Sequence, residues 1–201
     1  MALPASDNFN RTDALSLGSN WTSIYAPNGG GGQIVSNAAG AYEIPDVGII
    51  WNADTFDDDH YAEGTVSGSP GAGGATGLCV RGSSSGYYAY YSFSGGSYLI
   101  RVDADDTVTQ LGSTGDAWSD GDTVRLEADG TTITPMINGS EDTSIGAQTD
   151  STYSSGSAGI GGISAIIARS RRACRRASAC ATTTTPDPSP GTTPRRRCSC
   201  R

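Results

Sequence analysis

The sequence predicts an all-β protein, folded as an antiparallel β-sandwich, on three observations. Apolar and polar residues alternate over short stretches, which is the two-residue period of a strand with one buried face. These stretches recur at intervals of roughly ten residues and end at Gly, Asn or Asp, as in sandwich domains. No window of about eleven residues or more shows the apolar stripe of a helix. A chain of 201 residues suits one domain of this kind.

Six stretches are predicted to be strands that end in turns. Gly95-Gly96, Asp129-Gly130 and Asn138-Gly139 have the composition of tight hairpin turns. Pro135 cannot donate a hydrogen bond to a neighbouring strand, so its strand is predicted to be an edge or bulged strand. In chain order the predicted strands are residues 60–68, 76–84, 87–95, 97–105, 122–130 and 132–139.

Alternation within these strands predicts which side chains face the core. The core face is predicted to hold Leu78, Val80, Ile100, Val102, Val124, Leu126, Ile133 and Ile137. The opposite face is predicted to hold Cys79, Arg81, Arg101, Asp103, Arg125 and Glu127. Tyr87 and Tyr91 alternate in step with Phe93 and are predicted to point inward, which leaves Tyr88 and Tyr90 on the open face.

Charge divides the chain into a sandwich, residues 1–168, and a tail, residues 169–201. The first segment has four arginines and twenty acidic residues, a formal charge of −16. The second has nine arginines, one aspartate and four of the five cysteines, a charge of +8. Two explanations stay open for this low-complexity tail: a disordered Arg/Cys/Thr/Pro-rich segment, or an out-of-frame reading of a GC-rich gene.

The same features exclude several kinds of partner. A strongly acidic surface repels phosphate, so we expect no nucleic-acid binding by residues 1–168. The longest apolar stretch, residues 160–168, is about half the length of a membrane span, so we expect no membrane insertion. The first residues lack the basic and apolar regions of a signal peptide, which predicts synthesis in the cytoplasm.

Five segments carry a resemblance to a known family. They are "DNFNRTDALSLGSNWT" (7–22), "DDDHYAEGTVSG" (57–68), "GYYAYYSFSGGSYLIRVD" (86–103), "GDTVRLEADGTTIT" (121–134) and "GSAGIGG" (156–162). Their order resembles that of the concanavalin A-like (laminin-G-like) jelly rolls of bacterial and bacteriophage surface proteins, over residues 6–163. The resemblance implies a jelly-roll sandwich. It does not select a function, because this fold serves lectins, adhesins, virion proteins and glycanases.

The residues that could perform chemistry are few. The Glu-x-Asp-x-x-Glu strand of glucanases with this fold is absent, and His60 is the single histidine, so the sequence predicts no enzyme. Asp57, Asp58 and Asp59 form the densest group of oxygen ligands. They predict either a solvated turn, in which case no cofactor is expected, or a calcium site.

The open face is the predicted ligand-binding surface. Tyrosine rings stack on sugars, while arginine and glutamate bond the sugar hydroxyls. The candidate ligand-binding residues are Arg81, Tyr88, Tyr90, Arg101, Arg125 and Glu127. Cross-strand pairs of the same residue types also stabilise an ordinary solvent-facing sheet, so a purely structural role stays open.

These features together predict a non-catalytic recognition or structural module. We expect its partner to be a glycan or a cell or virion surface, and the protein to be a virion component. Two alternatives stay open. One is a glycan-cleaving enzyme of the same fold, and the other is a structural shell or filament protein that buries its open face against copies of itself, as a homo-oligomer.

Overall fold

The computed structural model describes residues 5–25, 31–42, 47–68, 75–93 and 95–163, and these residues form strands and loops. None of them belongs to a helix that could cross a membrane. The predicted tail, residues 169–201, lies outside the described residues. The structure therefore does not distinguish between the two explanations for its sequence. The sandwich predicted for residues 1–168 is therefore described as far as Ile163.

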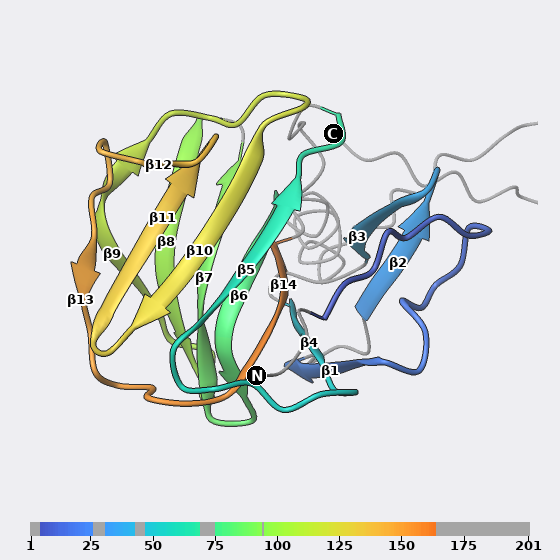
Figure 1. Cartoon of the computed structure of the whole chain (residues 1–201), viewed down its shortest axis with the longest axis horizontal. Coiled ribbons are helices and arrows are strands. Elements are labelled where there is room, and N and C mark those ends of the chain that lie inside the picture. The colour runs from blue at the N-terminus through green and yellow to red at the C-terminus, as the bar shows by residue number, and fades with distance from the viewer. Residues whose placement is uncertain (1–4, 26–30, 43–46, 69–74, 94, 164–201) are drawn as a thin grey trace, which may run out of the picture.

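A seven-stranded antiparallel sheet forms one layer of the molecule (Figure 1). Its order is β1-β4-β14-β6-β7-β8-β9, so the last described strand lies between strands from the first half of the chain. The bounds are β1 Trp21–Tyr25, β4 Val47–Trp51, β14 Ser157–Ile163, β6 Ala75–Ser83, β7 Gly86–Phe93, β8 Gly96–Asp103 and β9 Val108–Gly115.

A five-stranded sheet lies in front of the first one in Figure 1, with a separate hairpin beside it. The sheet has the order β12-β11-β10-β5, and β13 pairs with β11 off this path. The bounds are β5 His60–Thr65, β10 Thr123–Asp129, β11 Thr132–Ile137, β12 Ser140–Glu141 and β13 Gln148–Thr149, with β2 Gly31–Val35 and β3 Ala38–Tyr42 in the hairpin. The predicted all-β antiparallel sandwich is confirmed.

Pro135 lies where its missing N–H does no harm. Strand β11 pairs with β10 along one side, but its other side pairs with β13 only at Thr132–Ile133 and with β12 only at Met136–Ile137. Pro135 falls in the gap between these two short strands. The edge-like position that the proline predicted is therefore present on one side of β11.

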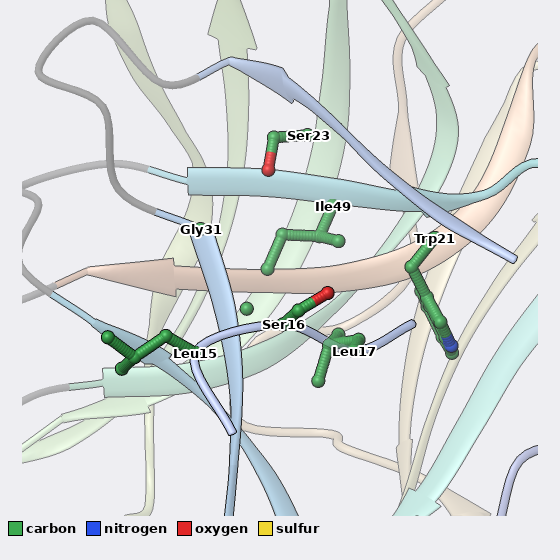
Figure 2. A pocket seen from close by; sticks show the side chains of 8 residues that line it. Leu15, Ser16, Leu17, Trp21, Ser23, Gly31 and Ile49 are labelled. Carbon is green, nitrogen blue, oxygen red and sulfur yellow. The ribbon is translucent and has the colours of Figure 1, made fainter. Parts of the chain in front are cut away.

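The N-terminal segment is tied to edge strand β1 by a hydrogen bond from Trp21 to Asp7, whose carboxylate also pairs with Arg11. Both Arg11 Nη atoms donate to the carboxylate of Asp7, at 2.6 and 2.8 Å, and Trp21 Nε1 donates to the same carboxylate at 2.9 Å. The bond from Arg11 lowers the pKa of Asp7 to about 2, against the opposing effect of burial. Leu17, from the same segment, packs against Ile49 of β4 (Figure 2).

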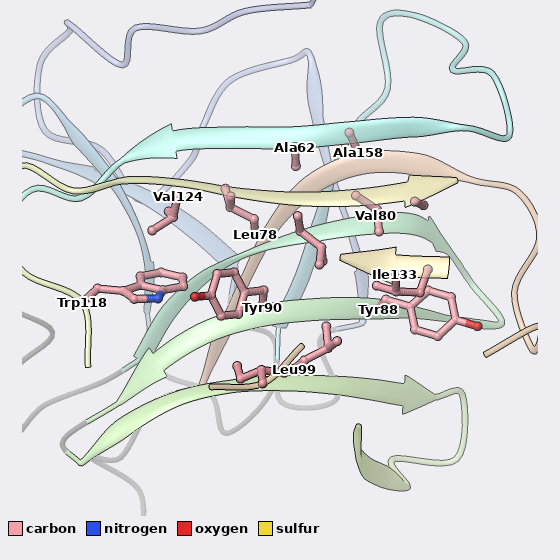
Figure 3. Packing of buried hydrophobic residues seen from close by; sticks show 13 residues of the cluster. Ala62, Leu78, Val80, Tyr88, Tyr90, Leu99, Trp118, Val124, Ile133 and Ala158 are labelled. Carbon is pink, nitrogen blue, oxygen red and sulfur yellow. The ribbon is translucent and has the colours of Figure 1, made fainter. Parts of the chain in front are cut away.

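The main core fills the space between the two sheets (Figure 3). Predicted core residues lie there, including Leu78 and Val80 of β6 and Leu126 of β10. The register explains the packing: Tyr90 of β7 lies opposite Leu78 of β6 on one side and Leu99 of β8 on the other. Paired residues share a face, so Tyr90 points into the core with its neighbours.

The prediction for Ile100 and Val102 is wrong. Both point to the outer face of the seven-stranded sheet, where they form a second buried cluster with Cys79, Tyr87 and Ala89. Leu99 occupies the core position instead. Strand β8 has apolar residues at both alternate sets of positions, so alternation alone does not identify its core face. The pairing with β7 does.

Candidate functional site

The open face predicted for Tyr88 and Tyr90 does not form on β7. Both residues are 0% exposed and lie between the sheets (Figure 3). The Tyr88 hydroxyl donates to Asp150 Oδ1 at 2.7 Å, and the Tyr90 hydroxyl donates to Asp142 Oδ2 at 2.9 Å. These acceptors make burial of the hydroxyls tolerable. Tyr87, predicted to point inward, is on the outer face, so the face assignment for this strand was reversed.

Arg81 is also withdrawn from solvent, with a side chain that is 1% exposed. It lies at the irregularity between Val80 and Ser83, and its backbone φ of 53° turns the chain out of the regular strand. The guanidinium donates to the carbonyl oxygens of Asp58 and Tyr153 at 3.0 and 3.1 Å. Arg81 therefore joins loops at one end of the sandwich and cannot touch a ligand on a sheet face.

Arg101 does not lie on the predicted open face: it pairs with the buried Tyr88 and belongs to a polar network on the core side of the seven-stranded sheet. Its guanidinium lies 2.9 Å from Asp103 and 2.7 Å from Asp150. Burial raises the pKa of Asp150, but hydrogen bonds from Thr152, Tyr88 and Arg101 outweigh it and bring the pKa to about 2. The guanidinium is thus committed to two carboxylates, and it lies on a different sheet from Arg125.

The Asp57–Asp59 loop holds neighbouring segments of the chain together through hydrogen bonds. Asp59 Oδ1 accepts a hydrogen bond from the backbone N–H of Gly130 at 2.8 Å and from Arg81 at 3.3 Å. The carbonyl oxygens of Asp57 and Asp58 accept from His60 and Arg81. Among the described residues, no three side chains of His, Cys, Asp or Glu are grouped to hold a metal ion. The geometry gives the calcium prediction no support.

The tautomer of His60 follows from these bonds. The backbone N–H of Arg81 points at Nε2, 3.1 Å away, so Nε2 is the unprotonated acceptor. Nδ1 then carries the proton and donates to the carbonyl oxygen of Asp57 at 2.7 Å. Burial lowers the pKa of His60 below its ordinary value of 6.5, and the positive charge of Arg81 lowers it further. The hydrogen bond to Asp57 and the charges of Asp58 and Asp59 act in the opposite direction and raise this pKa.

We expect the protein to lose stability as the pH falls below about 6.5, the ordinary histidine pKa. Between that value and the lower folded pKa, the unfolded chain binds more protons, so the free energy of unfolding decreases with falling pH. Denaturant titrations of the wild type and of His60→Gln at several pH values between 7.5 and 5 check this. The difference between the two curves should shrink toward low pH. Parallel curves would show that His60 is not held neutral.

The outer face of the five-stranded sheet brings together the remaining predicted residues. Arg125 and Glu127 point outward from β10, opposite the buried Val124 and Leu126, as the alternation predicted. Strand β5 contributes Tyr61 beside Glu127 and Glu63 beside Arg125. Strand β11 contributes Thr134 and Met136 in the same two rows. We call Tyr61, Glu63, Arg125, Glu127, Thr134 and Met136 the Tyr61 face.

The centre of the Tyr61 face is an ordered stack of planar groups. The Arg125 guanidinium lies 4.0 Å from the centroid of the Tyr61 ring, a cation–π distance. Arg125 Nε and Nη2 both bond Glu63 Oε2, at 2.8 and 2.7 Å, and Nη1 lies 3.9 Å from Glu127. Tyr61 is nevertheless 46% exposed. The arrangement holds an aromatic ring and hydrogen-bonding groups side by side in contact with solvent.

Tyr61 and Glu63 are not among the ligand-binding residues predicted from the sequence. A signal was present: in residues 60–65 the small Ala62 and Gly64 alternate with Tyr61 and Glu63, which places the larger polar pair outward. The missing information was that β5 pairs with β10, a strand more than fifty residues later, in this register.

A pocket of about 130 Å³ lies between the N-terminal segment and strands β1, β2 and β4 (Figure 2). Its lining residues are Leu15, Ser16, Leu17, Trp21, Ser23, Gly31, Gly32 and Ile49. A side chain at position 32 would collide with Leu17, which explains the glycine there. The pocket is smaller than the roughly 300 Å³ at which ligand pockets of small molecules begin. We therefore take the Tyr61 face as the candidate site.

The fold and this face define a β-sandwich with an exposed aromatic and polar surface. No protein-family model matches the chain, and no curated protein matches it by sequence. A solved structure is similar: the carbohydrate-binding module CBM66 from Bacillus subtilis, with a TM-score of 0.55 and 14% identity. The match covers 73% of this chain and 92% of the module. It shows a shared β-sandwich fold, which agrees at a coarse level with the jelly-roll resemblance.

Proposed function

We propose that this protein is a non-catalytic glycan-recognition module that binds its ligand on the Tyr61 face. The proposal rests on the Tyr61 ring, which is half exposed and lies against the Arg125 guanidinium. Glu63 holds this guanidinium in place by a hydrogen bond. The fold likeness to a carbohydrate-binding module supports the same class of ligand.

The chemistry of the face suits a sugar. The apolar C–H face of a pyranose can stack on the Tyr61 ring, as sugars commonly do on exposed aromatic side chains. Carboxylate oxygens of Glu63 and Glu127 can accept hydrogen bonds from hydroxyl groups. Because the ring and guanidinium are already held in place, binding orders fewer side chains and costs less entropy.

The setting of this activity is a further part of the proposal. By its resemblance to jelly rolls of bacterial and bacteriophage surface proteins, we propose that the module acts on a cell or virion surface. The binding experiments below do not depend on that setting, and they do not depend on the oligomeric state.

We expect Tyr61→Ala to weaken binding to any glycan that the wild type binds by at least about tenfold, since exposed aromatic anchors dominate such contacts. Tyr61→Phe should keep most of the affinity because it keeps the ring. Stability should change by less than about 1 kcal/mol, since Tyr61 lies on the surface. A glycan array identifies ligands, and calorimetric titration measures the affinities.

Val108→Ala is the matched control. Val108 is also an exposed apolar residue, 44% exposed, but it lies on β9 of the other sheet. This variant should bind like the wild type. If Tyr61→Ala binds as tightly as the wild type, the ligand occupies another surface and the proposed site is wrong. If the wild type binds no glycan on the array, the proposed function is wrong.

A further inference from the structure

The charge of the Tyr61 face sets which sugars it can accept, and this inference rests on the proposed function. Strands β5, β10 and β12 bring several acidic residues to the same side of the five-stranded sheet. They are Glu63, Glu127, Asp129 and Glu141, and each of them is at least partly exposed to solvent. Arg125 is the one cation that these three strands and β11 place there.

The positive charge of Arg125 is already balanced by neighbouring carboxylates, so it adds little attraction for an anionic ligand. Two of its nitrogens bond the same oxygen of Glu63, the third lies 3.9 Å from Glu127, and its guanidinium carbon lies 4.0 Å from the centroid of the Tyr61 ring. An incoming carboxylate or sulfate would share this single guanidinium with Glu63 and Glu127, and both carboxylates would repel it. The other arginines in the described part of the chain, Arg11, Arg81 and Arg101, are ion-paired elsewhere.

The carboxylates, in contrast, keep acceptor capacity. The side chains of Glu63 and Glu127 are 41% and 42% exposed, and each carboxylate has about four lone-pair sites. They favour ligands that donate hydrogen bonds, such as hydroxyl and ammonium groups. They repel ligands that carry negative charge.

We infer that the Tyr61 face selects neutral and amine-bearing sugars and rejects uronic acids and sulfated sugars. Two unit charges about 4 Å apart in water interact by roughly 1 kcal/mol, which is about a fivefold change in a binding constant. With more carboxylates than guanidinium groups on the face, we expect a uronic-acid ligand to bind at least about fivefold more weakly than its neutral counterpart.

The test uses an array that holds matched neutral, amine-bearing and uronic-acid oligosaccharides of each backbone, with the full chain as the probe. Binding of neutral and amine-bearing members, with the uronic acids weaker or absent, is the expected result. The preference for the amine-bearing member over the neutral one should decrease from 0.05 to 0.5 M salt, because the distance over which salt screens exposed charges falls from about 14 to about 4 Å in this range.

Two variants separate the charge effect from a general change. Glu127→Gln removes one carboxylate from the face and should narrow the gap between neutral and uronic-acid ligands. Asp116→Asn makes the same charge change at an exposed position outside both sheets and should leave the gap unchanged. Uronic acids bound as tightly as neutral sugars at the Tyr61 face would overturn the inference while leaving the proposed function intact. Binding of no member of the array would overturn both.

Discussion

Replacing Arg81 by alanine is expected to lower the free energy of unfolding by about 3 kcal/mol, since hydrogen bonds made by charged groups are among the strongest in proteins. The side chain is 1% exposed and bonds the backbone carbonyl oxygens of Asp58 and Tyr153. Alanine would leave these carbonyl groups without their donor and open a cavity between the loops. The ion pair with Asp59 adds less, because that carboxylate is 61% exposed.

Two further variants at this position separate the side chain from the backbone. Arg81→Gly also removes the bonds, but glycine tolerates the φ of 53°, where other residues are strained by about 1–2 kcal/mol. We therefore expect Arg81→Gly to be less destabilising than Arg81→Ala. Arg81→Lys keeps the charge but has one nitrogen for several acceptors, and should recover part of the loss. Urea denaturation measures all three, and an Arg81→Ala protein as stable as the wild type would disprove the buried clamp.

The second large effect is expected at Asp142, which is 8% exposed. Its Oδ2 accepts hydrogen bonds from the hydroxyls of Tyr90 and Ser97, at 2.9 and 3.1 Å, and its Oδ1 accepts from the backbone N–H of Ser144. Asp142→Ala leaves the hydroxyls of two buried side chains without this acceptor. Each buried donor left unsatisfied costs about 1–3 kcal/mol, so we expect a loss of about 3 kcal/mol in the free energy of unfolding.

A double-mutant cycle tests the cause. Tyr90→Phe in the wild type removes a satisfied hydroxyl and should cost about 1 kcal/mol. In the Asp142→Ala background the same change removes a hydroxyl that has lost its acceptor, so its cost should be smaller or its sign reversed. Thermal or urea unfolding of the four proteins gives the coupling. Effects that add within about 0.5 kcal/mol, as at independent sites, would rule out the bond as the source of the loss.

The sequence by itself determined the class of fold and the solvent-facing side of one strand, β10. Strand periodicity, glycine-containing turns and the lack of a helical stripe predicted the antiparallel sandwich. In β10 the alternation is clean, since the apolar Val124 and Leu126 alternate with the charged Arg125 and Glu127, so the buried and exposed sets could be assigned without a structure. Local pattern was sufficient there because only one of the two faces is apolar.

The tertiary structure decided the rest. In β7 and β8, tyrosines and aliphatic residues occupy both alternate sets of positions, and both faces of the sheet are buried there, so alternation carried no information on direction. Because the backbone is irregular at Arg81, this residue, which was predicted to lie on the surface, is buried and joins two loops. Tyr61 and Arg125 lie in contact because β5 pairs with β10. Strand pairing joins residues far apart in the chain, and a local period of two residues does not encode which strands will meet.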